Sequence, residues 1–191
     1  NLYHHGFLVN TPSVTVGFDL PQGVFESFHI ETARFDRILQ ATQALFVSHD
    51  HKDHADAYAI PRMIELGRPV IVPFGLWEGD PLYPTLIKPE RHWTLENRLT
   101  LDDSTVTFRV FPGHQGTELL NNVYLVELPG GLTVMHTGDQ SYAEDFAVWI
   151  DRVRDRFAVD VLLPNCWSTD LPRLIRGVDP NVSETALGAG N

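Results

Sequence analysis

The sequence has one cysteine, two lysines and no apolar run long enough to cross a membrane. A single cysteine, Cys166, excludes an internal disulfide and fits a reducing compartment, where its ordinary role is that of a small buried residue. A membrane-spanning helix needs about 18 or more consecutive apolar residues, so no span is predicted. No basic segment followed by an apolar one opens the chain, so no signal peptide is predicted and a cytoplasmic location is expected.

Basic residues are scarce as a class. The chain has 14 Lys and Arg residues against 25 Asp and Glu residues, which gives a net charge of −11. Such a surface repels polyanions and offers no general phosphate-binding stripe. The charge therefore argues against long nucleic acid as a partner and favours a small-molecule substrate.

The 191 residues suffice for one sizeable core, and no repeat, low-complexity tract or linker divides them. We therefore expect a single domain over residues 1–191. Strand patterns lie at Phe7–Thr11, Val14–Leu20, Ala44–Ser48, Pro69–Pro73, Thr105–Phe111, Asn122–Leu128, Leu132–His136 and Val159–Leu163. Helical patterns lie at Glu31–Gln43, Ala55–Leu66, Ala143–Phe157 and Thr169–Arg176. This mixture predicts an α/β (α+β) fold in which outer helices cover two sheets.

The strongest chemical signal is the segment His49-Asp50-His51-Lys52-Asp53-His54, which follows the apolar strand at Ala44–Ser48. Three imidazoles and two carboxylates fall within six residues. Neutral imidazole and carboxylate are favoured ligands of zinc and neighbouring transition metals. A His-rich surface loop is the alternative interpretation, and the density of ligand-type residues argues against it.

Two later residues extend this pattern. His114 lies in Pro112-Gly113-His114-Gln115-Gly116, which we predict to be a loop after the strand Thr105–Phe111. Asp139 follows the strand Leu132–His136 in the sequence His136-Thr137-Gly138-Asp139. Taken alone, the first would be an ordinary surface histidine and the second a turn residue. Because each follows a strand, as the histidine segment does, both are candidate metal ligands.

A His-x-His-x-Asp-His motif after an apolar strand, then a single His, then an Asp after a hairpin, resembles the metallo-β-lactamase superfamily. The resemblance covers most of the chain up to about Asn165 and implies a four-layer αββα sandwich with its metal site at one edge. It implies that His49, His51 and His114 hold one ion, that Asp53 and His54 hold a second, and that Asp139 bridges both. Asp19 resembles the aspartate that the family places beneath its metal ligands.

The resemblance also implies a function. An Asp rather than a Cys at position 139 is similar to the non-lactamase branches: lactonases, phosphodiesterases, glyoxalase-type thioesterases and RNase Z, with the lactonase and RNase Z-like branches most similar. The implied enzyme is a binuclear metal-dependent hydrolase with two divalent ions, zinc first and manganese or iron as alternatives. A hydroxide that bridges the metals would attack an ester, lactone, thioester or phosphodiester, with Asp53 and Asp139 as catalytic residues. Family members often form homo-oligomers, so a homo-oligomer is a possible state.

One feature departs from the family pattern. The family supplies a last histidine to the second ion from near the C-terminus, and this sequence has no histidine after His136. Either the chain is incomplete at its ends or the second ion is held more weakly. A third interpretation is a non-catalytic, metal-binding relic of the same fold that acts as a sensor or assembly partner. Retention of the six other ligand positions favours the enzyme.

Overall fold

The computed structural model describes residues 6–25, 28–140, 153 and 155–164. Its first sheet has the strand order β1-β2-β5-β6, with bounds β1 Phe7–Asn10, β2 Thr15–Phe18, β5 Ala44–Phe46 and β6 Val70–Ile71. The β1–β2 pair is antiparallel, whereas β2, β5 and β6 run parallel. The carboxyl ends of these three parallel strands therefore meet at one edge of the sheet.

The second sheet has the order β11-β10-β9-β8-β7. Its strands are β7 Asn97–Leu101, β8 Ser104–Gln115, β9 Leu119–Glu127, β10 Thr133–His136 and β11 Val161–Leu163. All neighbours are antiparallel except β10 and β11. A small hairpin of β3 (Gly23–Phe25) and β4 (Phe28–His29) and a 3-10 turn, η1 (Tyr83–Thr85), complete the strands and turns.

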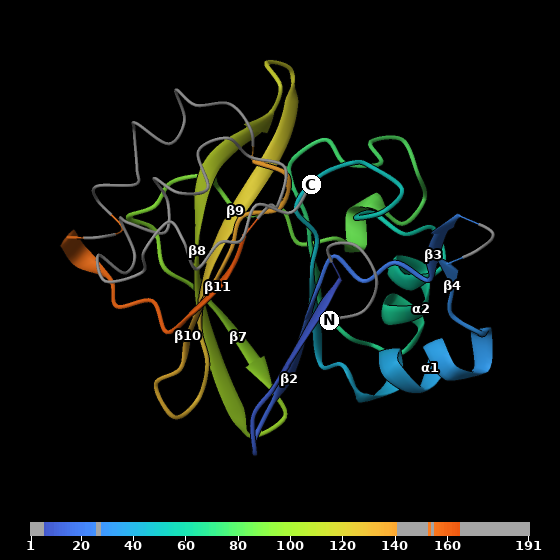
Figure 1. Ribbon diagram of the computed structural model, residues 1–191, viewed down its shortest axis with the longest axis horizontal. Coiled ribbons are helices and arrows are strands. Elements are labelled where there is room, and N and C mark those ends of the chain that lie inside the picture. The colour runs from blue at the N-terminus through green and yellow to red at the C-terminus, as the bar shows by residue number, and fades with distance from the viewer. Residues whose placement is uncertain (1–5, 26–27, 141–152, 154, 165–191) are drawn as a thin grey trace, which may run out of the picture.

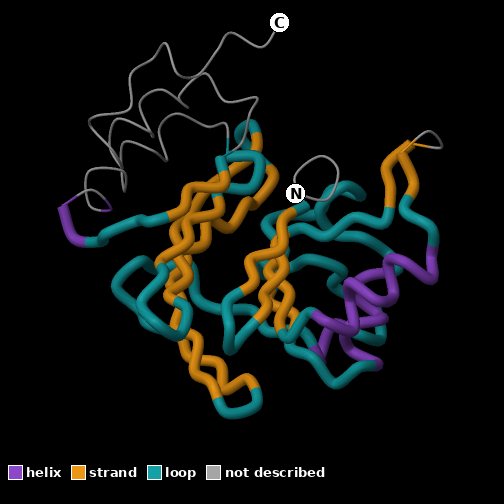
Figure 2. Tube along the Cα trace, turned by 60° about the horizontal axis from the view of Figure 1, so that its bottom comes forward, coloured by secondary structure: helices purple, strands orange, loops and turns teal. Residues whose placement is uncertain are grey.

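The two sheets face each other, and helices α1 (Thr32–Ala41) and α2 (Ala59–Glu65) cover the outer face of the first sheet (Figures 1 and 2). The alternation of strand side chains produces this layering. Phe46 points between the sheets, where it contacts Phe108 and Tyr124. Its neighbour Leu45 belongs to the core beneath the helices, with Phe35 and Leu39.

The outer face of the second sheet has its own apolar cluster. Phe111, Val123, Leu125 and Met135 pack there with Val153. Three of the four expected layers are thus described: the α1–α2 layer and the two sheets. Most of the predicted helix Ala143–Phe157, and the whole of the predicted helix Thr169–Arg176, lie outside the described residues.

Most predicted elements are confirmed within a few residues, and two need correction. Helix α2 begins at Ala59 rather than Ala55, because the Asp56 carboxylate accepts the backbone N–H groups of Tyr58 and Ala59. Strand β8 does not end at Phe111 but runs on through Gln115, so His114 lies on a strand and not in a loop. The reason is an unbroken antiparallel register with β9 as far as Gln115 and Leu119.

No helix among the described residues is long and apolar enough to span a bilayer.

Candidate metal centre

The histidine segment leaves the carboxyl end of β5 and lies beside Asp19, which leaves the carboxyl end of β2. Because β2 and β5 are parallel neighbours, the two chain segments emerge at the same sheet edge. Ser48 and His49 are fully buried, whereas Asp50 and His51 are exposed. The segment therefore begins in the interior and turns outward over the edge of the sheet.

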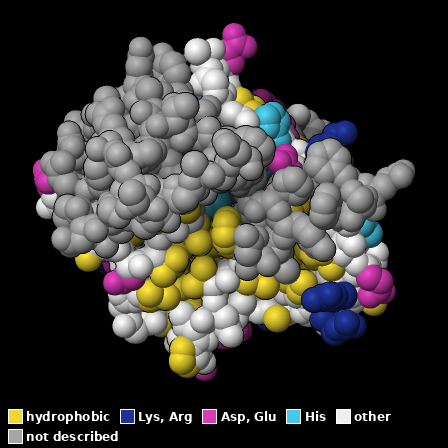
Figure 3. Space-filling model, in the orientation of Figure 1, with side chains coloured by type: hydrophobic (Ala, Val, Ile, Leu, Met, Phe, Trp, Pro, Cys, Tyr) yellow, Lys and Arg dark blue, Asp and Glu magenta, His cyan; other side chains and the backbone are white. Residues whose placement is uncertain are grey.

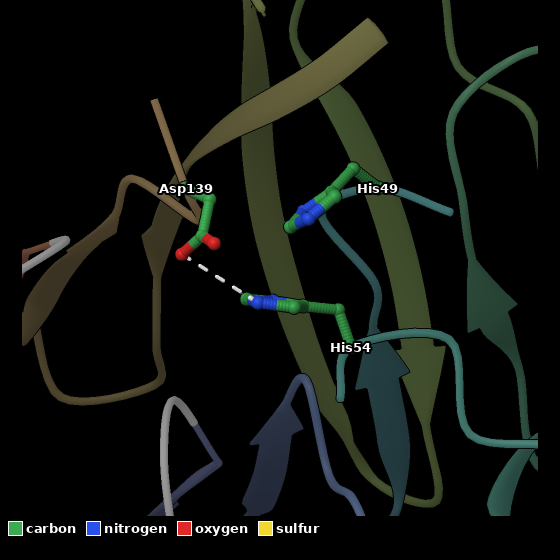
Figure 4. Close-up of side chains that lie close together, drawn as sticks. All are labelled: His49, His54 and Asp139. Atoms are coloured by element: carbon green, nitrogen blue, oxygen red, sulfur yellow. Dashed lines mark ion pairs between the residues drawn. The ribbon is translucent and has the colours of Figure 1, made fainter. Parts of the chain in front are cut away.

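Three side chains from distant segments converge at this edge. His49, His54 and Asp139 each offer a ligand atom, and these atoms lie within 4.8 Å of one another (Figure 4). All three residues are buried. Asp139 comes from the loop after β10, so the cluster joins the first sheet to the second.

The distances from His54 to two carboxylates are those of metal ligands. His54 Nε2 lies 3.5 Å from Asp139 Oδ1 and 3.6 Å from Asp53 Oδ2. Hydrogen bonds from nitrogen to oxygen are usually about 2.7–3.2 Å long. Two ligand atoms that each lie about 2.0–2.2 Å from a tetrahedral ion are about 3.4 Å apart. The donor set and its distances therefore fit a divalent cation.

A single carboxylate, Asp19, orients the two buried histidines. Its Oδ2 atom lies 2.8 Å from His54 Nδ1 and 2.6 Å from Ser48 Oγ, and Ser48 Oγ lies 2.9 Å from His49 Nδ1. His54 can donate its Nδ1 proton directly to Asp19, while His49 can donate to Ser48, which donates to Asp19 in turn. Both rings are then left with Nε2 as the ligand atom.

Asp19 has a third imidazole neighbour. His136 Nε2 lies 2.6 Å from Asp19 Oδ2, and the Ser48 backbone N–H donates to Asp19 Oδ1 at 2.6 Å. Asp19 itself is fully buried and adopts a left-handed backbone with φ of 45°. This conformation is uncommon for a residue other than glycine and costs on the order of 1–3 kcal/mol. The hydrogen bonds from the surrounding groups hold it.

The charges in this network are set by burial and by neighbours. Burial alone would raise the pKa of the Asp19 carboxyl, but His54 and His136 hold that pKa well below its usual range. Burial lowers the pKa of His49 to about 4. Burial also opposes protonation of His54, yet the carboxylates of Asp19 and Asp139 raise its pKa to about 10. In the metal-free protein His49 is therefore neutral and His54 carries a proton.

Comparisons with known proteins bear on the fold. No protein-family model and no curated protein gave a match to the sequence. Among solved structures, a metallo hydrolase from the archaeon Ignicoccus hospitalis is similar, with 18% identity and a TM-score of 0.55 over 83% of this chain and 66% of that one. A metallo-β-lactamase from Cronobacter sakazakii is 18% identical, with a TM-score of 0.53 over 84% of this chain and 70% of that one. The chain has the metallo-β-lactamase fold.

The fold predicted from the histidine motif is thereby confirmed, and at these identities the likeness extends to the fold alone. CmlA, a diiron β-hydroxylase from Streptomyces venezuelae, is also similar, with 16% identity and a TM-score of 0.57 over 85% of this chain and 33% of that one. The chain spans about two thirds of the archaeal hydrolase's length, at 66%. Because the similar structures include a hydroxylase beside hydrolases, the metallo-β-lactamase fold does not by itself choose the reaction.

The remaining predicted ligands lie around the three-residue cluster and not within it. His51 Nδ1 is 3.1 Å from His49 Nε2, and Asp53 is half-buried beside His54. His114 lies on the same face of β8 as Phe108 and Val110, which pack between the sheets. His114 also donates its backbone N–H to Gln140 Oε1 at 2.8 Å.

Strand β9 is hydrogen-bonded both to the start of the histidine segment and to the loop that carries Asp139. The sequence analysis did not predict this role of β9. The Asn121 amide donates to Thr137 O at 2.8 Å and accepts the Asp139 backbone N–H at 3.1 Å. The Asn122 backbone N–H donates to Ser48 O at 2.8 Å, and the Tyr124 hydroxyl donates to Val47 O at 2.7 Å. Two adjacent asparagines inside an otherwise apolar strand are unusual. That oddity was the available signal.

Gly138 permits the close approach of the two sides. Its φ is 53°, and a Cβ placed there would lie 2.6 Å from Ser48 Oγ. Only glycine combines this backbone conformation with the absence of a side chain. Next to it, Gln115 Nε2 donates to Asp139 Oδ2 at 3.2 Å, which leaves Asp139 Oδ1 facing His54.

Proposed function

We propose that this chain is a metal-dependent hydrolase that activates water to cleave an ester, lactone, thioester or phosphodiester of a small molecule. The observation that carries the proposal is the buried convergence of His49, His54 and Asp139 at ligand spacing. The similar structures of this fold that are named as hydrolases support the reaction class.

The donor set suits two divalent ions, with zinc as the first candidate and manganese or iron as alternatives. His49, His51 and His114 would hold one ion, Asp53 and His54 the other, and Asp139 would lie between them. When bound, such ions acidify water and polarise the bond that is cleaved. His54 Nε2 and Asp139 Oδ1 face each other at 3.5 Å, which supports a role for Asp139 at the same metal centre as His54.

The chain's own groups divide the remaining work. Asp53, whose side chain is 27% exposed, lies at the open side of the cluster and can accept a proton from the attacking water. Asp139 is nearly buried and is held by Asn121 and Gln115, so its role is to fix the centre. Asp19 and Ser48 keep the two imidazole rings in one tautomer.

A serine hydrolase is the competing chemistry, because Ser48, His54 and Asp19 are mutual neighbours. The geometry argues against it. In a catalytic triad the histidine uses one ring nitrogen for the serine and the other for the aspartate. Here Ser48 Oγ and Asp19 Oδ2 both lie against Nδ1 of His54, at 3.2 and 2.8 Å. Ser48 is also fully buried, so its hydroxyl is a relay and not a nucleophile.

Metal content tests the proposal first. Protein purified without chelator should contain two divalent ions per chain by plasma mass spectrometry. Asp139→Ala should lose at least one ion and reduce kcat/KM more than about 100-fold, since loss of outer hydrogen-bond partners alone costs 10–100-fold. Asp103→Ala, at an exposed aspartate of the β7–β8 turn, is the matched control and should retain both ions.

The activity assay uses an aryl ester, a lactone, a thioester and a phosphodiester, each with and without chelator. Chelator-sensitive turnover of any one supports the hydrolase. If the protein holds two ions per chain but cleaves none of the four substrates, the result would instead favour the non-catalytic, metal-binding relic. One ion per chain would contradict the binuclear part of the proposal.

A further inference from the structure

A cavity of about 820 Å³ borders the histidine segment. Two stretches of chain form it: the segment from Asp50 to Pro61, and the turn at residues 77–82 that follows β6. Besides alanine, proline and glycine residues, its lining consists of Asp50, Lys52, Trp77, Glu78, Asp80 and Leu82. Its volume is that of a pocket for a small organic molecule.

The topology places this cavity next to the proposed metal centre. Strands β5 and β6 are parallel neighbours, so the chain segments that follow them leave from the same sheet edge. Ligand pockets in parallel sheets form at this edge, outside the carboxyl ends of the strands. Asp50 and Lys52 line the cavity and are chain neighbours of the proposed ligands His49, His51 and Asp53. The Cα atom of each therefore lies about 3.8 Å from the Cα atom of a proposed ligand.

The wall opposite the histidine segment is built around Trp77. This residue adopts a left-handed backbone with φ of 56°, which costs on the order of 1–3 kcal/mol for a residue other than glycine. Its half-buried ring packs against the core beneath the helices. The turn that carries it is closed by a hydrogen bond from the Asp80 backbone N–H to Trp77 O at 2.9 Å. The aromatic wall is therefore fixed in place before any ligand arrives.

The charge of the lining is unbalanced. Three exposed carboxylates, Asp50, Glu78 and Asp80, face one exposed ammonium group, Lys52. A lining of this sign attracts cations and repels anions over a few ångströms. An aromatic face beside carboxylates is also the surface that binds quaternary ammonium groups.

We propose that this cavity is the substrate pocket of the hydrolase and that it takes an apolar group with a positive charge. The proposal rests on the proposed function and narrows it. Cationic esters and thioesters are preferred to neutral ones, and substrates with an anionic group beside the scissile bond, phosphodiesters included, are disfavoured.

Three acetyl thioesters test the order of preference. One is acetylthiocholine, one carries a tert-butyl group in place of the trimethylammonium group, and one ends in a sulfonate. We expect kcat/KM to fall in that order, by on the order of tenfold from the first to the last at low salt, with less difference at high salt. Equal rates for the three, or preference for the sulfonate, would overturn the proposal.

A charge variant ties the preference to this cavity. In Glu78→Gln with Asp80→Asn, the ratio of kcat/KM for the cationic and neutral thioesters should fall to near one. Both residues are exposed, and asparagine keeps an oxygen for the Leu82 backbone N–H that Asp80 accepts at 2.8 Å. Asp103→Asn removes an equally exposed charge at the β7–β8 turn and should change neither ratio nor rate. An unchanged ratio in the double variant would place the specificity elsewhere.

A binding measurement separates this proposal from the hydrolase itself. Saturation-transfer NMR with phenyltrimethylammonium and with benzenesulfonate requires no turnover. Binding of the cation alone, weakened in the double variant, supports the pocket even if no thioester is cleaved, in which case only the hydrolase proposal fails. Turnover of the thioesters without binding of the cation would overturn the pocket and leave the hydrolase standing.

Discussion

The histidine segment and the second-sheet side of the centre reach the same point by different means. Four of the six proposed ligands, His49, His51, Asp53 and His54, lie within six residues of one chain segment. The other two, His114 and Asp139, are 25 residues apart and lie on β8 and after β10. Figure 3 shows histidine side chains beside acidic ones where the described surface meets the grey segments. The first-sheet ligands thus come from one short segment, whereas the second-sheet ligands come from two separate elements of the fold.

Their support differs as well. The histidine segment depends on one charged group, Asp19, which serves two rings at once. The second-sheet side depends on neutral groups: the amides of Asn121 and Gln115 and the missing side chain of Gly138. The first should therefore be sensitive to charge and pH, and the second to shape.

The largest effect should come from a change of shape at Gly138. In Gly138→Ala the new Cβ would overlap Ser48, so the loop that carries Asp139 must move away from the histidines. We expect metal affinity to fall more than about 100-fold, because outer hydrogen-bond partners alone are worth 10–100-fold. Metal competition with a chromophoric chelator measures this loss.

Gly67→Ala is the matched control. Gly67 also has a positive φ, 68°, but a Cβ there would meet nothing within 4 Å. This variant should lose about 1 kcal/mol of folding stability from backbone strain and keep its metal affinity. Equal metal loss in both variants would mean that backbone strain, and not the overlap with Ser48, is responsible.

A smaller effect is expected from removing the charge on the other side. Asp19→Asn keeps the size of the side chain but loses the carboxylate that orients His54 and, through Ser48, His49. Metal affinity should fall about 10–100-fold. Asp56→Asn is the control, since Asp56 is also nearly buried but accepts hydrogen bonds only from backbone N–H groups among the described contacts. An Asp19→Asn protein with wild-type metal affinity would show that the histidines are oriented by packing alone.

The same contrast explains what the sequence could predict. The motif at His49–His54 is contiguous and follows a buried strand, so residue types and spacing indicate a metal site, and the resemblance of this motif to a known family implies the fold. His114 was assigned to a loop because Pro112 and Gly113 suggest a strand end. In the structure the pairing with β9 continues past both residues, and the register that carries the strand onward is not visible in local sequence.

The contacts that join the two sides could not be predicted for a similar reason. Asn121 and Tyr124 bond to residues 16 and 77 positions away, and such separations are fixed only when both sheets are in place. His136 entered the prediction as the end of a strand and the last histidine of the chain and not as part of the site, yet it is a direct neighbour of Asp19. Sequence patterns predicted which groups can bind metal, while tertiary contacts determine which of them meet.

A pH dependence of metal binding should also belong to the histidine side. The pKa of His54 is raised to about 10 from an ordinary value of 6.5, so protonated His54 stabilises the metal-free fold below about pH 6.5, and this stabilisation is lost as pH rises toward 10. Metal must displace that proton, whereas His49, with a pKa of about 4, has none to lose. Apparent metal affinity should thus rise about tenfold per pH unit between pH 7 and 9, with release of about one proton per chain in calorimetry across buffers.

The slope of metal affinity against pH should shrink in Asp19→Asn, which removes the main charge that raises the pKa of His54, and stay unchanged in Asp56→Asn. A flat profile in the wild type would contradict the protonated state of His54, and a two-proton slope would mean that a second histidine also loses a proton when metal binds.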